Sequence, residues 1–204
     1  MTGYGRVSLE HAEVTGARIH MRSSSKGDAL ACFELLHEEP RITDWILWDG
    51  PEELVEVERM LDPWKKERKT ETAYYFSIVE RASDEWAGCL GLKHAMEKPM
   101  AMIWYFAGVP YHGRGLTSEA VRLAVELAFR ELEVMLVLAK VFVGNNASIR
   151  ILEKVGMRLD EGRESVHEKK GEEVTAQSYS ISRVDWELGA PPKGDWQVRS
   201  TRED

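Results

Sequence analysis

The chain has 204 residues, of which 43% are hydrophobic, and its formal net charge at pH 7 is −8. This length suits a single domain with its own core, and the ordinary hydrophobic content argues against a disordered chain. The apolar runs are shorter than the ~20 residues that a transmembrane helix needs. The excess of acidic residues argues against nucleic-acid binding through a basic surface. We therefore expect a protein with neither a nucleic-acid nor a membrane partner.

Two cysteines and the first residues of the chain indicate the compartment. Cys32 and Cys89 lie far apart in apolar surroundings, which is typical of buried free thiols in a reducing compartment. Neither a disulfide framework nor a zinc site is expected, and residues 1–13 contain no apolar segment of a secretory signal. We therefore expect a cytoplasmic protein without a bound metal. An acidic surface favours cationic partners such as amines or basic peptides, although solubility alone would explain the charge.

The first half of the chain shows both helical and strand-like spacing of its apolar residues. The predicted elements are a strand, two helices and two antiparallel strands, at residues 17–22, 28–36, 51–69, 72–79 and 86–93. Residues 42–48, between the two helices, are unusually aromatic. They either line a substrate mouth or pack on the core as a lid.

The second half is predicted to alternate strands and helices before a final hairpin. The elements are a strand, a helix, a strand, a helix and a hairpin, at residues 100–106, 116–131, 134–143, 145–155 and 157–166 with 174–186. The strand at 134–143 is nearly all apolar, as expected for a strand covered on both faces. We predict one domain over residues 15–187, with an extension at 1–14 and a polar, loose tail at 188–204.

A glycine turn joins the strand at 100–106 to the helix at 116–131. Gly113 and Gly115 carry no side chain, so main-chain N–H groups there can approach a ligand closely. The helix start adds unpaired N–H groups and a partial positive charge. Together these features predict a phosphate-binding cradle. A tight turn without a ligand explains the glycines equally well, since the segment lacks the motifs of dinucleotide-binding folds and P-loops.

The turn resembles motif A of the GNAT acetyltransferases, Gln/Arg-x-x-Gly-x-Gly/Ala, which holds the pyrophosphate of acetyl-CoA. The matching run is His112-Gly113-Arg114-Gly115-Leu116-Thr117. His112 replaces Gln or Arg, and Thr117 replaces the small last residue. Because the motif acts mainly through main-chain N–H groups, these side-chain changes affect the match more than the mechanism.

Four further segments resemble the ribosomal-protein N-acetyltransferase branch of this family, the RimJ/RimL-like enzymes. Residues 144–157 match its Asn-x-x-Ser-hydrophobic-Arg…Glu-Lys-x-Gly-Phe signature. The other matches are Ser118-Glu119-Ala120, Glu161-Gly162-Arg163 and Asp185-Trp186. The five matches occur in the family's order, and the similarity spans roughly residues 15–187.

The resemblance implies an α/β (α+β) GNAT fold and a particular cofactor. The sheet is expected to be mixed, mostly antiparallel and of about seven strands, with helices on both faces. The strands at 100–106 and 134–143 are expected to splay apart and hold the pantetheine arm between them. Acetyl-CoA is the expected co-substrate, and the family transfers the acetyl group directly to an amine in a ternary complex.

The resemblance also implies roles for individual residues. The expected cofactor contacts are Tyr105, Phe106, His112, Gly113, Arg114, Gly115, Leu116, Thr117, Asn145 and Ser148. Ser148 could donate a proton to the departing thiolate, or it could serve only as a first-turn serine. Asn145 could contact the pantetheine arm or cap the following helix. Tyr105 is expected to pack against neighbouring side chains. Arg114 is expected either to contact a phosphate or to lie in solvent on the turn.

The general base is expected on the strand after Glu161-Gly162-Arg163. Counting from Gly162 gives Glu168, and counting back from Gly171 gives His167. A histidine takes up protons near neutral pH, whereas a glutamate needs burial to do so. A water molecule as the acceptor of the proton is the third alternative.

Three functions follow from the resemblance. The first is acetyl transfer to a primary amine, most specifically the N-terminal amine of a protein or peptide with a basic N-terminus. The second is acetylation of a small-molecule amine, such as a polyamine, antibiotic or amino acid. The third is a catalytically inactive CoA-binding module. A monomer and a homodimer both fit the sequence.

Overall fold

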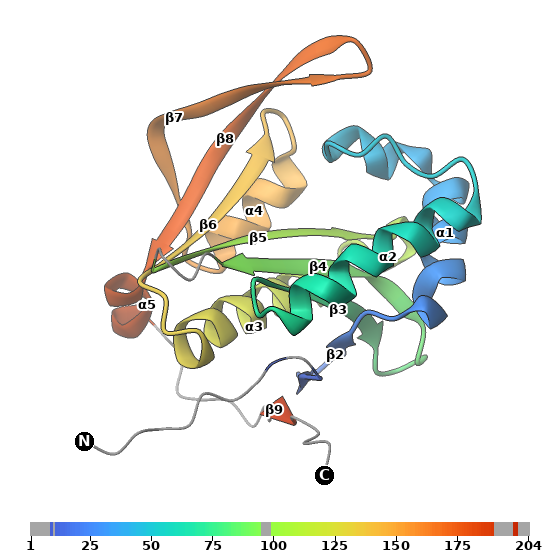
Figure 1. Ribbon diagram of the computed structural model, residues 1–204. Coiled ribbons are helices and arrows are strands. Elements are labelled where there is room, and N and C mark those ends of the chain that lie inside the picture. The colour runs from blue at the N-terminus through green and yellow to red at the C-terminus, as the bar shows by residue number, and fades with distance from the viewer. Residues whose placement is uncertain (1–8, 10, 95–98, 190–197, 200–204) are drawn as a thin grey trace.

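Nine strands form one sheet in the computed structural model, which describes residues 9, 11–94, 99–189 and 198–199. Within these residues the strand order is β7-β8-β6-β5-β4-β3-β2-β1-β9 (Figure 1). The strands are β1 (Glu13–Thr15), β2 (Ile19–Ser23), β3 (Ala73–Glu80), β4 (Trp86–His94), β5 (Met100–Ala107), β6 (Leu136–Phe142), β7 (Arg158–Lys169), β8 (Glu172–Ser182) and β9 (Val198–Arg199). All neighbours are antiparallel except β5 and β6, so the predicted mixed, mostly antiparallel sheet is confirmed.

The sheet has more strands than the expected seven or so because both terminal segments contribute one. β1 pairs with β2 on one side and with β9 on the other. The rest of the predicted tail, residues 190–197 and 200–204, lies outside the described residues, as do residues 1–8 and 10.

Helices cover both faces of the sheet, as predicted. They are η1 (Lys26–Asp28), α1 (Ala29–Glu38), η2 (Pro40–Trp45), α2 (Leu54–Lys69), η3 (Val109–Tyr111), α3 (Leu116–Glu131), α4 (Asn146–Lys154) and α5 (Arg183–Gly189). α3 lies across one face, and α1 and α2 lie against the other (Figure 1). Within the described residues, no helix is both long and apolar enough to cross a membrane.

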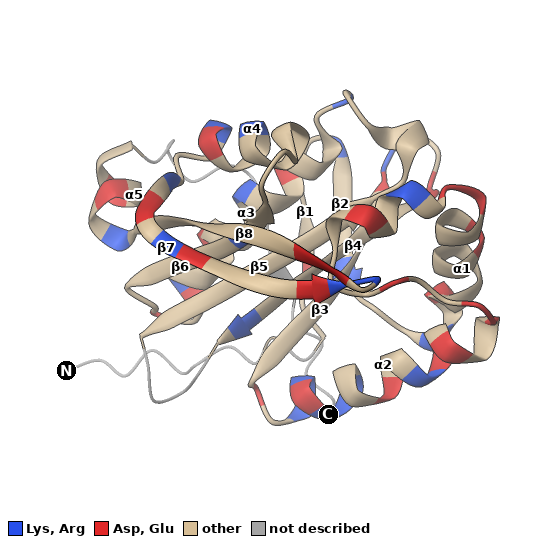
Figure 2. Cartoon of the chain, turned by 90° about the horizontal axis from the view of Figure 1, so that it is seen from above, with Lys and Arg blue, Asp and Glu red and all other residues tan. Residues whose placement is uncertain are grey.

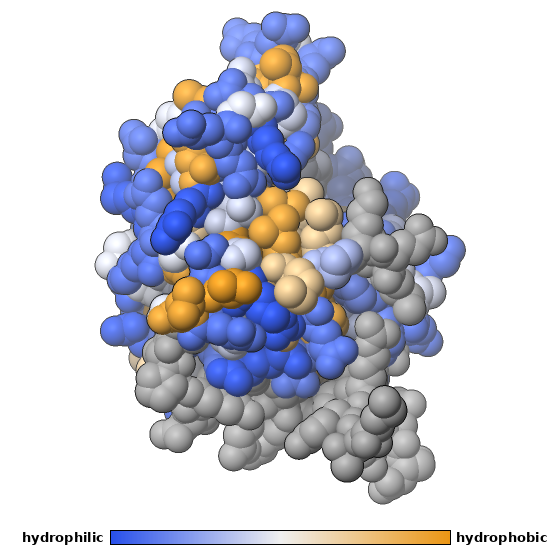
Figure 3. Space-filling view, turned by 90° about the vertical axis from the view of Figure 1, so that its left-hand side faces the viewer, coloured by the Kyte–Doolittle hydropathy of each residue, from blue (hydrophilic) through white to orange (hydrophobic). Residues whose placement is uncertain are grey.

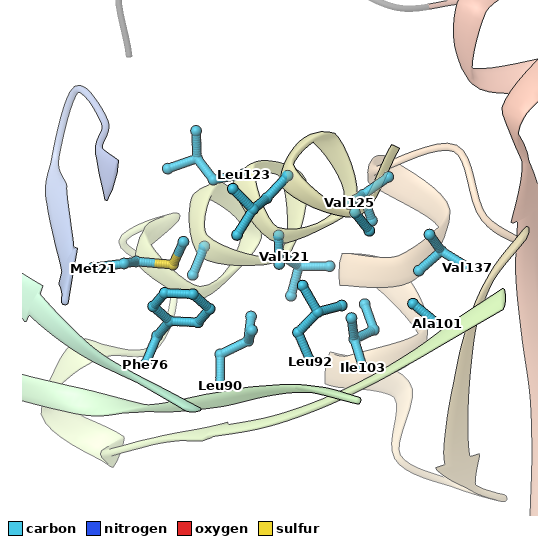
Figure 4. Packing of buried hydrophobic residues seen from close by; sticks show 14 of the residues in the cluster. Met21, Phe76, Leu90, Leu92, Ala101, Ile103, Val121, Leu123, Val125 and Val137 are labelled. Atoms are coloured by element: carbon cyan, nitrogen blue, oxygen red, sulfur yellow. The ribbon is translucent and has the colours of Figure 1, made fainter. Parts of the chain in front are cut away.

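The main core lies between α3 and the sheet. Phe76, Leu90 and Leu92 point from the strands toward Val121 and Leu123 of α3 (Figure 4). The apolar residues of α3 recur every three or four positions, so one side of the helix is continuously buried. This packing fixes the start of α3, and therefore the glycine turn before it, relative to β5.

A second, smaller core joins α1 and α2 to the opposite face of the sheet. Its buried members include Cys32, Leu36 and Val57, and they pack against Cys89 and Phe106 from the strands. The face shown in Figure 3 is largely hydrophilic where it is coloured, with apolar side chains gathered near its middle. The aromatic stretch between α1 and α2 contributes to this smaller core, because Ile42 is one of its buried members and Trp48 packs against it.

Two predicted strands differ from the observed ones. The last strand ends at Ser182, because the Ser182 hydroxyl accepts a hydrogen bond from the Asp185 N–H at 3.1 Å and so caps α5. Trp186 therefore lies on a helix, with its ring tilted against that of Phe129 at a centroid distance of 5.2 Å. β6 is not covered on both faces: Val141 is buried in the main core, whereas Lys140 on the opposite face is exposed.

Candidate active site

The two central strands separate part of the way along their length. β5 and β6 pair in parallel from Met100 with Leu136 to Ile103 with Ala139, and the pairing ends there. Beyond this point β5 continues to Ala107 beside β4, while β6 continues beside β8 (Figure 1). The predicted splay is thus confirmed. It leaves one edge of β5 without a neighbouring strand directly before the glycine turn.

The glycine turn adopts a backbone conformation that favours glycine. Gly113 has φ of 71° and Gly115 has φ of 79°, a region that other residues enter at a cost. The first helical hydrogen bond runs from the Glu119 N–H to the Gly115 carbonyl at 3.0 Å. In the described part of the chain, the main-chain N–H groups from Gly113 to Ser118 meet no acceptor of ordinary hydrogen-bond geometry. These groups can therefore serve a bound anion.

A pocket of about 220 Å³ adjoins this helix start. Gly115 and Ser118 form part of its wall, and Arg18, Arg122 and Lys154 bring cations to it. Its lining also includes Glu119, whose carboxylate pairs with Arg18 at 3.3 Å. A ligand with several phosphates fits this combination of free amides and cationic side chains.

Arg18 and Arg122 were not identified from the sequence. Arg122 follows Ser118 by four residues, so helical spacing alone could have placed it on the same side of α3. Arg18 precedes β2, about a hundred residues away in sequence from the turn. No local pattern connects Arg18 to the pocket, because the connection depends on how β2 and α3 pack together.

The two long side chains of the motif turn away from the pocket. His112 donates from Nε2 to the Ala107 carbonyl at 2.9 Å. Arg114 pairs with Glu80 and lies over the ring of Tyr111. Arg114 is therefore held by Glu80 and Tyr111 rather than freely solvated.

Three other residues predicted to contact the cofactor, Phe106, Leu116 and Thr117, differ in how deeply their side chains are buried. The Phe106 side chain packs between Trp86 and Trp104 in the smaller core. Leu116 is buried in the main core, whereas Thr117 is half-buried at the helix start. Phe106 and Leu116 can therefore contact a ligand only through their main chains.

Tyr105, Ser148 and Asn145 come together across the separated strands. The Tyr105 hydroxyl lies 2.7 Å from Ser148 Oγ, joining β5 to the first turn of α4. Asn145 Oδ1 accepts from the Ser148 N–H at 3.1 Å, so the predicted helix cap is confirmed. Burial raises the pKa of Tyr105 to about 12, although the bond to Ser148 opposes the rise. Tyr105 therefore keeps its hydroxyl proton throughout the physiological range.

The two candidate bases lie on opposite faces of β7. Glu168 is exposed, whereas His167 is half-buried and its Nε2 lies 2.9 Å from Ser165 Oγ. Lys140 of β6 donates to the same Ser165 oxygen at 3.1 Å. Because side chains alternate along a strand, His167 and Ser165 share the face that is linked to β6. Glu168 lies on the other face.

The cysteines are poorly suited to covalent catalysis. Burial raises the pKa of Cys32 to about 12, and it raises the pKa of Cys89 further. Both thiols therefore stay protonated, while a thiolate is the reactive form. Among the described residues, no cluster of three or more histidine, cysteine, aspartate or glutamate side chains is placed to hold a metal.

Comparisons with known proteins agree with this geometry. Residues 18–158 match the family model described as Acetyltransferase (GNAT) domain. The chain is 31% identical over 104 residues to the Probable N-acetyltransferase YjcK of Bacillus subtilis (strain 168), and this match covers 50% of the chain and 58% of that protein. The chain thus spans less than two thirds of this curated relative.

Solved structures show the same fold at low sequence identity. One is the ribosomal-protein-S5-alanine acetyltransferase from Vibrio fischeri, with a TM-score of 0.74 and 16% identity, covering 85% of this chain and 98% of that one. Another is Mycobacterium smegmatis RimJ in complex with CoA-disulfide, with a TM-score of 0.72 and 18% identity, covering 86% and 87%. With a family model matched over more than half of its length, the chain belongs to the GNAT acetyltransferase domain family.

Proposed function

We propose that this protein transfers an acetyl group from acetyl-CoA to a primary amine. The observation that carries the proposal is the row of free main-chain N–H groups from Gly113 to Ser118, lying where β5 and β6 separate. These amides can bind the diphosphate of CoA, and Arg122 and Lys154 can pair with its remaining phosphate. The structural neighbour RimJ was solved with a CoA-disulfide, which supports the same cofactor here.

The residues around the split suit direct transfer between two bound substrates. Acetyl-CoA supplies the acetyl group as an activated thioester. The free edge of β5 beyond Ile103 offers main-chain N–H groups that can stabilise an oxyanion. Tyr105 and Ser148, joined by a hydrogen bond of 2.7 Å, can return a proton to the departing sulfur.

The proton released by the amine needs an acceptor on the opposite side of the split. Of the two predicted bases, His167 has the more suitable position, because it shares its face of β7 with Ser165, which bonds to Lys140 of β6. Glu168 points to the other face and is exposed. We therefore propose His167 as the base, and Ser148 with Tyr105 as the acid.

A protein or peptide N-terminus is the proposed acceptor. The support is the repeated occurrence of ribosomal-protein acetyltransferases among the structural neighbours, together with a net charge of −8 that favours a basic partner. A small amine is the alternative, and it is supported by similarity to MccE, a Microcin C7 self immunity acetyltransferase. We also propose a cytoplasmic location.

Thiol release tests the function. The protein is incubated with acetyl-CoA and a panel of amines: basic peptides with free N-termini, the same peptides with blocked N-termini, and polyamines. We expect rapid release of free CoA only with free N-terminal peptides. Preference for polyamines would favour the small-amine alternative. CoA binding without any thiol release would show an inactive binding module.

A further inference from the structure

A primary amine of the chain itself lies next to the proposed base. Lys140 Nζ donates a hydrogen bond to Ser165 Oγ at 3.1 Å, and the same oxygen lies 2.9 Å from His167 Nε2. Because an ammonium only donates, Ser165 accepts from Lys140 and can donate its own hydroxyl proton to a neutral imidazole. One hydroxyl group therefore separates the amine of Lys140 from the imidazole of His167.

Lys140 also lies where the two central strands begin to separate. The last paired residues of β5 and β6 are Ile103 and Ala139, and Lys140 is the next residue of β6. Ala139 is buried in the main core, so the side chain of Lys140 projects from the opposite face of the strand. β6 lies beside β8, and β8 lies beside β7, which carries Ser165 and His167 (Figure 2). The amine therefore starts at the margin of the split in which the thioester is proposed to lie.

The Lys140 side chain is held weakly. It is exposed, and in the described part of the chain Ser165 is the only hydrogen-bond partner of its ammonium. Lys93 of β4 projects from the same face of the sheet, as the register through Met102 to Leu138 shows, but its ammonium lies 3.9 Å from the Glu67 carboxylate. A lysine stem is flexible, and one exposed hydrogen bond contributes little free energy. The amine of Lys140 can therefore turn from Ser165 toward the split.

We propose that the protein acetylates its own Lys140 when no external acceptor is bound. The neutral amine attacks the carbonyl carbon of the bound thioester, so that a C–N bond forms, the C–S bond breaks and CoA leaves as the free thiol. The ammonium loses two protons in this step. One passes through Ser165 to His167 and then to solvent, and the other is balanced by the proton that Ser148 and Tyr105 return to the sulfur. The inference rests on the proposed acetyl transfer and adds an acceptor within the chain.

Self-acetylation and transfer to an external amine are expected to compete. Both reactions use the same thioester and the same base, and acetyl-Lys140 would have lost its charge. A lysine side chain is mostly protonated near neutral pH, and only the neutral amine attacks. The reaction at Lys140 is therefore expected to be slow and to become faster as pH rises.

The test incubates the unaltered protein with isotopically labelled acetyl-CoA in the absence of an acceptor. Mass spectrometry of peptides measures the label at each lysine, and Lys93 is the control for spontaneous acetylation, because it is 62% exposed on the same face. We expect Lys140 to be labelled at least about tenfold faster than Lys93. The labelled fraction at a given time should not depend on protein concentration, because the base and the amine belong to one molecule. A basic peptide with a free N-terminus should suppress the labelling of Lys140 and leave that of Lys93 unchanged.

Three variants separate self-acetylation from the ordinary reactivity of an exposed lysine. Ser165→Ala removes the hydroxyl between the amine and the base, and Gly115→Glu removes the proposed cofactor site. Both variants should reduce the labelling of Lys140 to the rate at Lys93. Ser178→Ala is the matched control, because Ser178 lies directly opposite Lys140 on β8, and it should leave the labelling unchanged.

Equal labelling of Lys140 and Lys93 in the unaltered protein would overturn the inference. The same holds for labelling of Lys140 that persists in folded Gly115→Glu, or that increases with protein concentration, since the latter indicates transfer between two copies. If the peptide is acetylated while Lys140 stays unlabelled, self-acetylation is wrong and the proposed function stands. Absence of transfer both to the peptide and to Lys140 would overturn the proposed function itself.

Discussion

At the scale of single residues, the contact between Tyr105 and Ser148 carries the strongest chemical expectation. The two hydroxyls are 2.7 Å apart, and Tyr105 stays protonated because burial raises its pKa to about 12. We expect Ser148→Ala and Tyr105→Phe each to lower kcat about 10²-fold, as for loss of a general acid, with little change in affinity for acetyl-CoA. Because the two act as one unit, the double variant should be barely slower than either single one. A loss of affinity with kcat intact would contradict the acid role.

His167 and Glu168 form a natural pair for comparison, because they are neighbours on opposite faces of β7. The rate should rise with pH as the base loses its proton. We expect His167→Ala to flatten this rising limb and Glu168→Ala to leave it intact. The measurement is kcat/KM across pH for both variants. Flattening in Glu168→Ala instead would identify Glu168 as the base. An unchanged limb in both variants would indicate that a water molecule accepts the proton.

Asp28 links stability to pH. Burial raises the pKa of Asp28, but hydrogen bonds from Arg22 and from the Ser25 N–H, at 2.8 Å, outweigh it, and the net shift is downward. A depressed carboxyl pKa stabilises the fold above the unfolded-state value of about 3.9, and this stabilisation is lost as pH falls through the folded-state pKa. Asp28→Asn should therefore lower the urea midpoint at pH 7. The difference from the unaltered protein should shrink below about pH 4, and a constant difference would contradict this account.

At the scale of elements, the cap of α4 connects helix stability to the site. Asn145 accepts from the Ser148 N–H and thus orients the residue that meets Tyr105. We expect Asn145→Ala to cost about 1 kcal/mol of unfolding free energy, measured by denaturant titration. Asn145→Asp retains an acceptor oxygen and should preserve most of that stability. Equal losses in both variants would show that the side chain acts in some way other than as a cap.

The elements that could be predicted from the sequence are those with strong local signals. Helical spacing identified α3, and the glycine turn before it was identified from its motif. The local signal did not predict the end of β8, where Ser182 caps α5, so that Trp186 lies on a helix and not on the strand. Spacing rules describe which face of an element is buried, but a cap can end a strand whose apolar pattern would continue.

Long-range contacts were not predictable in the same way. Arg18 reaches the pocket beside Gly115 because β2 packs near α3. The Lys169–Asp49 pair joins residues 120 positions apart. Lysines and aspartates have many potential partners in a sequence, and only the packed chain selects among them. For the same reason the sequence did not decide between His167 and Glu168. The choice depends on which of them shares the face of β7 with Ser165, which bonds to Lys140 of β6.

At the scale of the whole molecule, three parts of the fold surround one location. The separation of β5 from β6 provides a gap in the sheet, and the turn at Gly115 provides free amides. The β7–β8 hairpin carries His167 beside Ser165, which accepts a hydrogen bond from Lys140 of β6. The main core behind α3 holds the turn and the strands in fixed relation. Catalysis by proximity requires such fixed placement of two substrates.

The most direct test of this arrangement compares two glycine substitutions by calorimetric titration with acetyl-CoA. Gly115 and Gly162 have similar positive φ angles, 79° and 74°, so Gly115→Glu and Gly162→Glu carry similar backbone strain. A Cβ on Gly115 would make only an ordinary contact with Arg18, at 3.8 Å, and a Cβ on Gly162 would meet no atom within 4 Å among the described residues. Only the first places a carboxylate where the diphosphate is proposed to bind. We predict that acetyl-CoA binding is lost in folded Gly115→Glu and retained in Gly162→Glu. Equal affinity in both variants would contradict the proposal that the main chain at this turn holds the cofactor.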